Sequence, residues 1–191
     1  MTQYGISEEN SDRHVMIDIE TFGTTPGCVI RSIGAVFFNP KGHPEKSLGP
    51  EFYVNIREEE QLELGAVKDE KTVKWWNRWD NKKAQEQLLV DQKSFETAYN
   101  LFCMFIKGNN GKFMWGQGAN FDSVLLEDLM RKAGYQVPWQ FYNIRDTRTI
   151  YEAAEIDTEC VQRPGTFHNA LDDAKHQARL VQKSFARIAL I

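Results

Sequence analysis

The chain has no long hydrophobic run, few cysteines and no excess of positive charge. A membrane-spanning helix needs about 18 consecutive apolar residues, and no stretch of the chain is that long, so we expect no membrane span. Its three cysteines are odd in number and scattered, which argues against a disulfide framework or a zinc site and favours a reducing, cytoplasmic compartment. The net charge of −4 argues against a broad basic surface that coats duplex nucleic acid, but it allows a cleft that grips one strand end.

The length and the uniform composition predict one domain. A chain of 191 residues can bury a sizeable core, and it contains no repeats, low-complexity tracts or obvious linker. We therefore expect a single domain over residues 1–191. Residues 1–13 are polar and lack the apolar segment of a secretory signal, so we expect them to form a loose lead-in.

The hydrophobic pattern predicts an α/β fold with a mixed sheet. Three apolar runs separated by short turns predict an antiparallel meander, and residues 112–115 predict a further strand. Residues 57–71 are charged and without period, which indicates a loop. Apolar residues with helical spacing predict helices over 72–79, 94–107, 121–133, 146–154 and from 170 onwards. The expected N-caps of four of these helices are Thr72, Asn120, Asp146 and Asn169.

Two acids stand one residue apart in the first apolar run, His14–Thr21. Alternate side chains of a strand share a face, so Asp18 and Glu20 point the same way. Like charges about 4 Å apart repel by roughly 4 kcal/mol at an effective dielectric near 20, and a divalent cation removes this repulsion. An exposed strand end with two solvated acids is the alternative interpretation.

A third acid follows the strand predicted at 112–115. Glycines after that strand allow a tight turn, and Asp122 then falls in the first turn of the next helix. A carboxylate at this place also stabilises the helix through its dipole, by about 0.3–1 kcal/mol. Taken alone, Asp122 therefore fits a purely structural role better than a chemical one.

The start of the last helix offers an imidazole and a fourth acid. His168 lies just outside the predicted helix, and Asp173 lies in its first turn at the flank of the apolar stripe, where a cleft wall is expected. Asp172 fits a capping role better. For His168 the alternative is a partly exposed imidazole in a loop.

Together these segments supply oxygen ligands from three separate parts of the chain. Such ligands suit Mg²⁺ or Mn²⁺ better than zinc. Four carboxylates can hold two such ions about 3.5–4 Å apart, which is the arrangement used for in-line displacement at phosphorus. A nearby imidazole titrates close to neutral pH and can accept the proton of the attacking water.

With these three motifs the sequence resembles a known family, the DEDDh 3′–5′ exonucleases of the DnaQ-like superfamily. The segments that match its motifs, in the family's order, are Asp18-x-Glu20, Asn120-Phe121-Asp122 and His168-x-Ala170-x-x-Asp173. The resemblance implies an RNase H-like fold, a mixed five-stranded sheet flanked by helices. A finer likeness to phage exonuclease A, exonuclease VIII-type proteins and small bacterial exoribonucleases rests on Trp75-Trp76, Trp115-Gly116-x-Gly118 and Arg145-Asp146-x-Arg148-Thr149.

The resemblance also implies an activity and a role for each motif residue. The implied reaction is metal-dependent removal of nucleoside 5′-monophosphates from a 3′ end, with two Mg²⁺ or Mn²⁺ ions. Asp18 would bridge the two ions, and Glu20 would bind one ion and approach the terminal 3′-hydroxyl. Asp122 and Asp173 would complete the metal ligands, and His168 would be the general base.

Further residues are candidates for contact with the nucleic acid. We expect Thr21, Phe22, Asn120 and Arg148 to contact substrate, with Phe22 as a stacking platform and Arg148 near phosphates. For the arginine an ion pair at the helix start is equally compatible. Trp75 and Trp76 fit either base stacking or a core position.

Several questions stay open at the level of the sequence. Single-stranded or 3′-overhanging DNA and RNA are all possible substrates, and a homodimer is possible. One alternative function is a catalytically silent nucleic-acid-binding module of the same fold, which has no evident need for His168. Another is an RNase H-like endonuclease or integrase, whose all-carboxylate site the imidazole disfavours.

Overall fold

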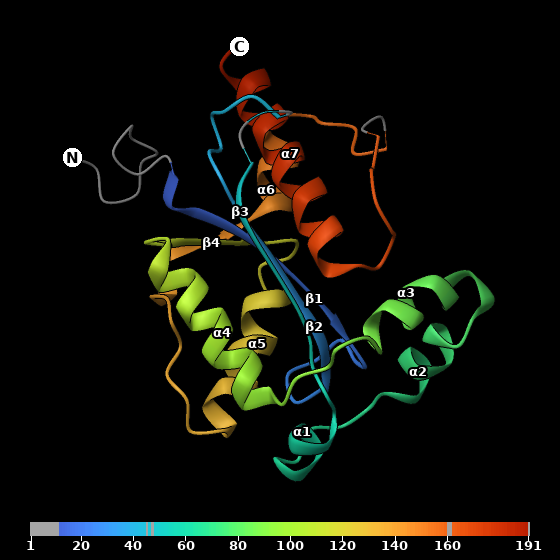
Figure 1. Cartoon of the computed structure of the whole chain (residues 1–191). Coiled ribbons are helices and arrows are strands. Elements are labelled where there is room, and N and C mark those ends of the chain that lie inside the picture. The colour runs from blue at the N-terminus through green and yellow to red at the C-terminus, as the bar shows by residue number, and fades with distance from the viewer. Residues whose placement is uncertain (1–11, 45, 47, 160–161, 191) are drawn as a thin grey trace.

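The computed structural model describes residues 12–44, 46, 48–159 and 162–190, which form a mixed sheet between two layers of helices (Figure 1). The sheet has five strands in the order β3-β2-β1-β4-β5. The first three strands pair antiparallel, and β4 and β5 run parallel to β1. Their bounds are β1 His14–Thr21, β2 Ile30–Phe38, β3 Leu48–Asn55, β4 Phe113–Gly116 and β5 Ile144–Asp146. The predicted mixed five-stranded sheet flanked by helices is confirmed.

The alternation of β1 divides its side chains between two cores. Val15, Ile17 and Ile19 pack on one face together with residues of α4 (Phe95–Gly108) and α5 (Asp122–Lys132). Met16 packs on the other face, against α6 (Thr147–Ala153) and α7 (Ala170–Ile188). Asp18 and Glu20 share the Met16 face, which is the face that α7 covers, as the period-two pattern predicts.

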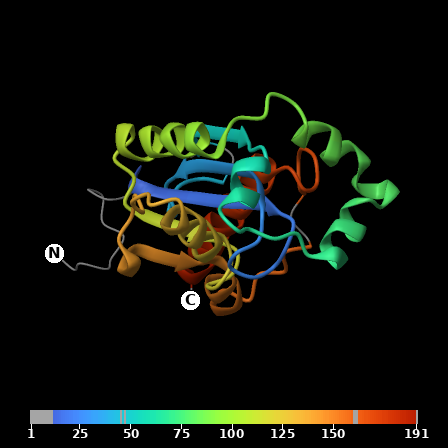
Figure 2. The same cartoon turned by 90° about the horizontal axis from the view of Figure 1, so that it is seen from below.

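A helical arm projects beyond the end of β1 (Figure 2). It consists of α2 (Glu70–Trp76), a 3₁₀ turn (Trp79–Asn81) and α3 (Lys82–Leu88). Its own small core consists of Trp76, Ala84 and Leu88. The sequence pattern missed α3, because two buried aliphatic residues in a charged segment give too weak a period.

The prediction of a loop over residues 57–71 is wrong in part. The short helix α1 (Glu59–Glu63) lies within it, and α2 begins at its end. Gln61 on α1 is buried, accepts a hydrogen bond from Ile30 N at 2.7 Å and donates to Ile30 O at 2.8 Å. These two hydrogen bonds fix α1 to the start of β2, and a pattern of hydrophobic residues does not report such a contact.

Two of the predicted N-caps are correct and two are wrong. Asp146 caps α6 and Asn169 caps α7. The cap of α2 is Asp69, which accepts a hydrogen bond from Thr72 N at 2.8 Å, so Thr72 lies inside the helix. Asn120 is exposed and does not cap α5, whose N-cap position is Phe121. The carboxylate of Asp172 accepts from Thr166 N instead of closing a capping box.

The structure also bears on the expected membrane span, the cysteines and the N-terminal lead-in. No helix among the described residues is long and apolar enough to span a membrane. Cys28 and Cys103 are buried and free, whereas Cys160 lies outside the described residues. Most of the predicted lead-in, residues 1–11, also lies outside them, and Arg13 donates a hydrogen bond to Asn110 O at 3.1 Å. The single domain over residues 1–191 stays a prediction.

His14 makes folding stability depend on pH. Its Nδ1 accepts a hydrogen bond from Trp115 Nε1 at 2.9 Å, and its ring stacks on Phe113 at 4.6 Å. Burial, together with the positive charge of Arg145, lowers its pKa to about 3. Because the unfolded chain takes up the proton more readily, this group removes stability as the pH falls from about 6.5 towards 3.

We therefore predict that His14→Gln changes the pH dependence of unfolding. Below about pH 6.5, the stability of the wild type relative to the variant should fall by about 1.4 kcal/mol per pH unit. Urea unfolding of both proteins at pH 7, 6 and 5 measures this difference. A difference that stays constant over that range would contradict the buried neutral imidazole.

Candidate active site

The residues singled out by the sequence motifs meet in one cleft of about 820 Å³. Asp18, Glu20, Asp122, His168 and Asp173 all line it. They come from the end of β1, the first turn of α5 and the start of α7, which are far apart in the sequence. The structure therefore brings together the three segments whose acids and imidazole the sequence analysis assigned to one site.

Gly116 allows Asp122 to approach β1. A Cβ at Gly116 would lie 2.7 Å from Asp122 Oδ2, a distance that side chains do not adopt. With glycine there, the carboxylate lies against the end of β4 and accepts a hydrogen bond from Gln117 N at 3.0 Å. Since β4 is parallel to β1 and next to it, Asp122 comes close to the acids of β1.

Gly34 plays the same part for α7. It lies opposite Asp18 in the β1–β2 register, and a Cβ there would overlap the backbone of Ala170 and Leu171. The first turn of α7 therefore rests directly on the backbone of β2. Asp173 in that turn faces the cleft, and His168 precedes the helix in a left-handed conformation with φ of 62°.

The ligand atoms are close enough to share a cation. Glu20, His168 and Asp173 each offer one oxygen or nitrogen atom, and these atoms lie within 4.8 Å of one another. Asp18 lines the same cleft, and its Oδ1 accepts a hydrogen bond from Gln177 Nε2 at 2.7 Å. This donor set is rich in hard oxygen atoms, which fits Mg²⁺ or Mn²⁺.

Burial and mutual repulsion raise the pKa values of the acids in the cleft. Burial, followed by the charges of Asp122, Glu20 and Asp173, raises the pKa of Asp18 well above its ordinary value. Burial raises the pKa of Glu20 to about 8 and that of Asp122 to about 7. Carboxylates so placed take up protons unless a cation joins them, because the basic side chains of the protein neutralise the group only in part.

Arginines supply part of the positive charge. Arg163, from the segment before α7, forms an ion pair with Asp173. Arg31 on β2 lowers the pKa of Glu20, opposing the effect of burial. The sequence analysis did not single out either residue, because an isolated arginine carries no spacing that would place it beside an acid of another segment.

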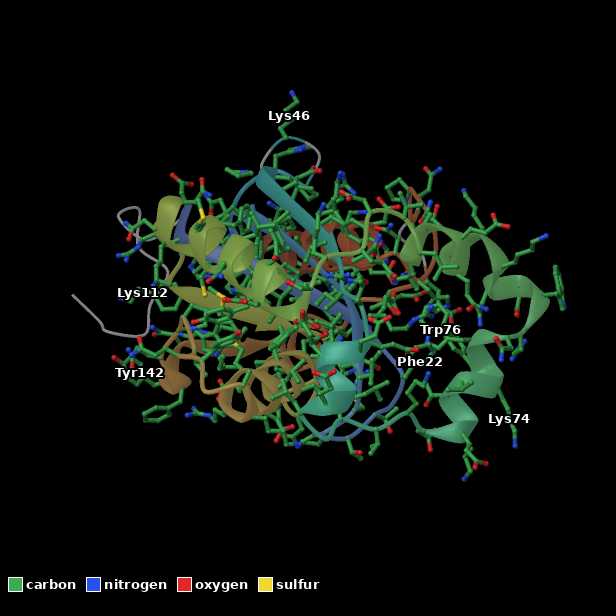
Figure 3. All side chains as sticks on the ribbon, turned by 60° about the horizontal axis from the view of Figure 1, so that its bottom comes forward. Phe22, Lys46, Lys74, Trp76, Lys112 and Tyr142 are labelled. Atoms are coloured by element: carbon green, nitrogen blue, oxygen red, sulfur yellow. The ribbon has the colours of Figure 1, made fainter. Side chains whose placement is uncertain are left out.

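Aromatic side chains of the arm form one wall beside His168. The ring of Trp75 meets that of His168 edge to face at 4.7 Å. Trp76 is buried, and its Nε1 donates to Thr21 O at 2.8 Å, so its position is a core position. The guanidinium carbon of Arg31 lies 4.2 Å from the ring centroid of Phe22 and 4.5 Å from that of Trp76. Figure 3 shows the side chains of Phe22 and Trp76 at the base of the arm.

The four expected substrate contacts lie in different surroundings. Arg148 lines the cleft. Thr21 is buried and lines a neighbouring hollow together with Trp75. Phe22 and Asn120 line neither of these two cavities: Phe22 packs under Arg31, and Asn120 is exposed on the loop before α5.

The cleft also contains residues that the sequence analysis missed. Gln177 and His176 lie on α7, and Tyr151 lies on α6. The sequence does contain a signal for Gln177. It follows Asp173 by four residues, so both side chains lie on one face of the helix. For Tyr151 no signal existed, because its place depends on how α6 packs on α7.

Comparisons with known proteins agree with this geometry. The sequence matches, over residues 13–185, the family described as the 3′-5′ exoribonuclease Rv2179c-like domain. No curated protein matches the sequence significantly.

Solved nuclease structures share the fold. The nuclease domain of 3′hExo, a DEDDh family member bound to rAMP, is similar with a TM-score of 0.64 at 12% identity, covering 94% of each chain. Cell-death related nuclease 4 gives a TM-score of 0.64 at 13% identity over 92% of this chain and 64% of its own. The RNase domain of yeast Pop2 gives a TM-score of 0.54 at 14% identity over 95% and 77%. The fold is thus the RNase H-like fold of DEDDh nucleases.

Proposed function

We propose that this chain, which belongs to the family of Rv2179c-like 3′-5′ exoribonuclease domains, removes nucleotides one at a time from the 3′ end of RNA. The released products would be nucleoside 5′-monophosphates. The observation that carries the proposal is the meeting of four carboxylates and one imidazole, from three separate segments, in a single cleft. An RNA substrate is supported by the family, and by the rAMP bound to the DEDDh nuclease of similar fold.

The acids of the cleft would hold two divalent ions, Mg²⁺ or Mn²⁺. When bound, such ions supply an acidified water and neutralise charge on the leaving oxygen. Asp18 is suited to bridge them, since the charges of Glu20, Asp122 and Asp173 all act on it. Glu20 would also orient the terminal 3′-hydroxyl.

His168 is suited to accept the proton of the attacking water. Burial lowers the pKa of its imidazole, so the ring is neutral at physiological pH and able to take up a proton. The ring of Trp75 packs against this imidazole at nearly a right angle and limits its rotation. Arg148, exposed at the cleft, would contact the phosphate backbone.

We predict that His168→Ala lowers kcat about a hundredfold, in line with loss of a general base. Mn²⁺ affinity, measured by isothermal titration calorimetry, should stay near that of the wild type. A variant that loses its Mn²⁺ isotherm would show that His168 is a metal ligand instead of the base.

The experiment that tests the proposed function is digestion of matched 5′-labelled RNA and DNA single strands. With Mg²⁺ or Mn²⁺, the RNA should shorten stepwise from its 3′ end and release 5′-monophosphates, EDTA should stop the reaction, and added Mn²⁺ should restore it. Binding without digestion would indicate a silent binding module, and internal cuts would indicate an endonuclease. Either result would overturn the proposal.

Three finer points belong to this proposal. The tandem tryptophans of the arm support a place near phage exonuclease A, exonuclease VIII-type proteins and small bacterial exoribonucleases. Single-stranded ends and 3′ overhangs are the expected substrates, because the net charge of −4 argues against a broad basic surface that coats duplex nucleic acid. A homodimer stays a prediction, which sedimentation velocity measures.

A further inference from the structure

One buried amide lies between α7 and the acid at the centre of the cleft. Gln177 is 5% exposed and lines the cleft, one helical turn after Asp173. Its Nε2 donates to Asp18 Oδ1 at 2.7 Å, and the two residues are 159 positions apart in the sequence. Its Oε1 is buried without a hydrogen-bond partner. The contact with Asp18 therefore determines how the amide group is turned.

The backbone around Gln177 is also fixed. The hydroxyl of Tyr151 on α6 donates to the carbonyl oxygen of Gln177 at 3.1 Å. Tyr151 is itself buried and lines the cleft. The contact with α6 thus fixes the backbone position of Gln177 on α7. The distance from this backbone to Asp18 on β1 is fixed as well.

An amide suits this place for a chemical reason. An ionised carboxylate only accepts hydrogen bonds, so the amide must offer its NH₂ group to it. This hydrogen bond occupies one carboxylate oxygen of Asp18, which restricts the rotation of the group. A fixed orientation is what a metal ligand gains from such a hydrogen-bond partner.

We propose that Gln177 is the positioning residue for Asp18: it holds this carboxylate in the orientation that binds the divalent ions, without touching substrate itself. The inference rests on the proposed function, since it assumes that Asp18 is a metal ligand. Partners of this kind contribute about 10–100-fold to metal affinity or activity.

A purely structural role is the competing explanation, and α7 offers a matched control. Gln182 is fully buried on the same helix, and its Nε2 donates to Asn39 O at 2.9 Å. It does not line the cleft. Loss of either amide removes a hydrogen bond that α7 makes to a strand or loop of the sheet layer, but of these two hydrogen bonds only that of Gln177 goes to an acid of the cleft.

The test compares Gln177→Met and Gln182→Met with the wild type, since methionine keeps the length of the side chain. Mn²⁺ binding is measured by calorimetry and folding by thermal melting. Gln177→Met should bind Mn²⁺ about 10–100-fold more weakly, whereas Gln182→Met should bind it as the wild type does. In assays, Gln177→Met should lower kcat but not raise the KM for the oligonucleotide, and high Mn²⁺ should restore much of the rate.

The outcomes separate this inference from the proposed function. If the wild type binds no Mn²⁺, the proposed metal site itself is wrong. If the wild type binds Mn²⁺ and Gln177→Met binds it equally well, the positioning role is overturned. Should the methionine variant fail to fold, Gln177→Asn withdraws the amide by one methylene group, and the same expectations apply to it.

Discussion

Replacing Asp18 with asparagine is expected to lower the rate of nucleotide release about a thousandfold. The side chain keeps its shape but loses the charge that faces Glu20, Asp122 and Asp173. Loss of several kcal/mol of metal-dependent stabilisation corresponds to a rate effect of about this size. Single-turnover digestion of a 5′-labelled RNA with Mg²⁺ measures it, and a rate equal to that of the wild type would contradict the assignment.

The same substitution is expected to make the metal-free protein more stable at pH 8. Burial and neighbouring acids raise the pKa of Asp18. A group with a raised pKa in the folded state contributes its full stability below its ordinary value of 3.8, and that stability is lost as the pH rises. Asparagine stays neutral and avoids this loss, so its melting temperature should exceed that of the wild type by roughly 2–4 °C per kcal/mol relieved.

Added Mn²⁺ should reverse the order of stability. The wild type gains stability from any ion that binds only the folded state, whereas Asp18→Asn gains little. Melting curves at pH 8, with EDTA and with Mn²⁺, measure both effects in one experiment. If Asp18→Asn melts below the wild type in EDTA, the ionised Asp18 does not destabilise the metal-free protein, which contradicts the raised pKa.

Gly34→Ala is expected to have the second large effect, although this residue carries no functional group. Its added Cβ would overlap the backbone of Ala170 and Leu171, so the start of α7 must move away from β2. Overpacking of this kind costs about 1–3 kcal/mol or more. Because the displaced segment carries His168 and Asp173, a shift of about 1 Å should also lower the rate about a hundredfold.

Gly108→Ala serves as the control for this substitution. Gly108 is the last residue of α4, and a Cβ there would have no neighbour within 4 Å. Alanine should leave activity unchanged and raise stability slightly, by about 0.5–1 kcal/mol. Urea unfolding and RNA digestion of both variants test the pair. A Gly34→Ala protein with wild-type stability and rate would show that α7 does not rest on β2 as described.

Much of the cleft follows from short-range patterns in the sequence. The alternation of side chains along β1 places Asp18 and Glu20 on one face of the sheet. The apolar face of α7 packs on the same face of the sheet, and Asp173 lies at the flank of that apolar face. Each pattern reports on its own segment only. That the segments meet in one cleft was inferred from the chemistry of their side chains and from the resemblance to a family, because spacing along the chain does not encode distances between segments.

Features that depend on long-range contacts could not be predicted. β5 has three residues, too few for a period, and it exists as a strand because it pairs with β4. α1 is fixed by the hydrogen bonds of Gln61 to Ile30. Asn120 fits the pattern of a cap but is exposed, since the chain enters α5 through Phe121 in an unusual conformation.

The central claim is that distant segments form one acidic pocket for divalent ions, and anomalous scattering from crystals soaked in Mn²⁺ tests it most directly. The account predicts two anomalous peaks about 3.5–4 Å apart, enclosed by Asp18, Glu20, Asp122 and Asp173. The absence of any peak among these four carboxylates, in crystals that show Mn²⁺ elsewhere, would contradict it.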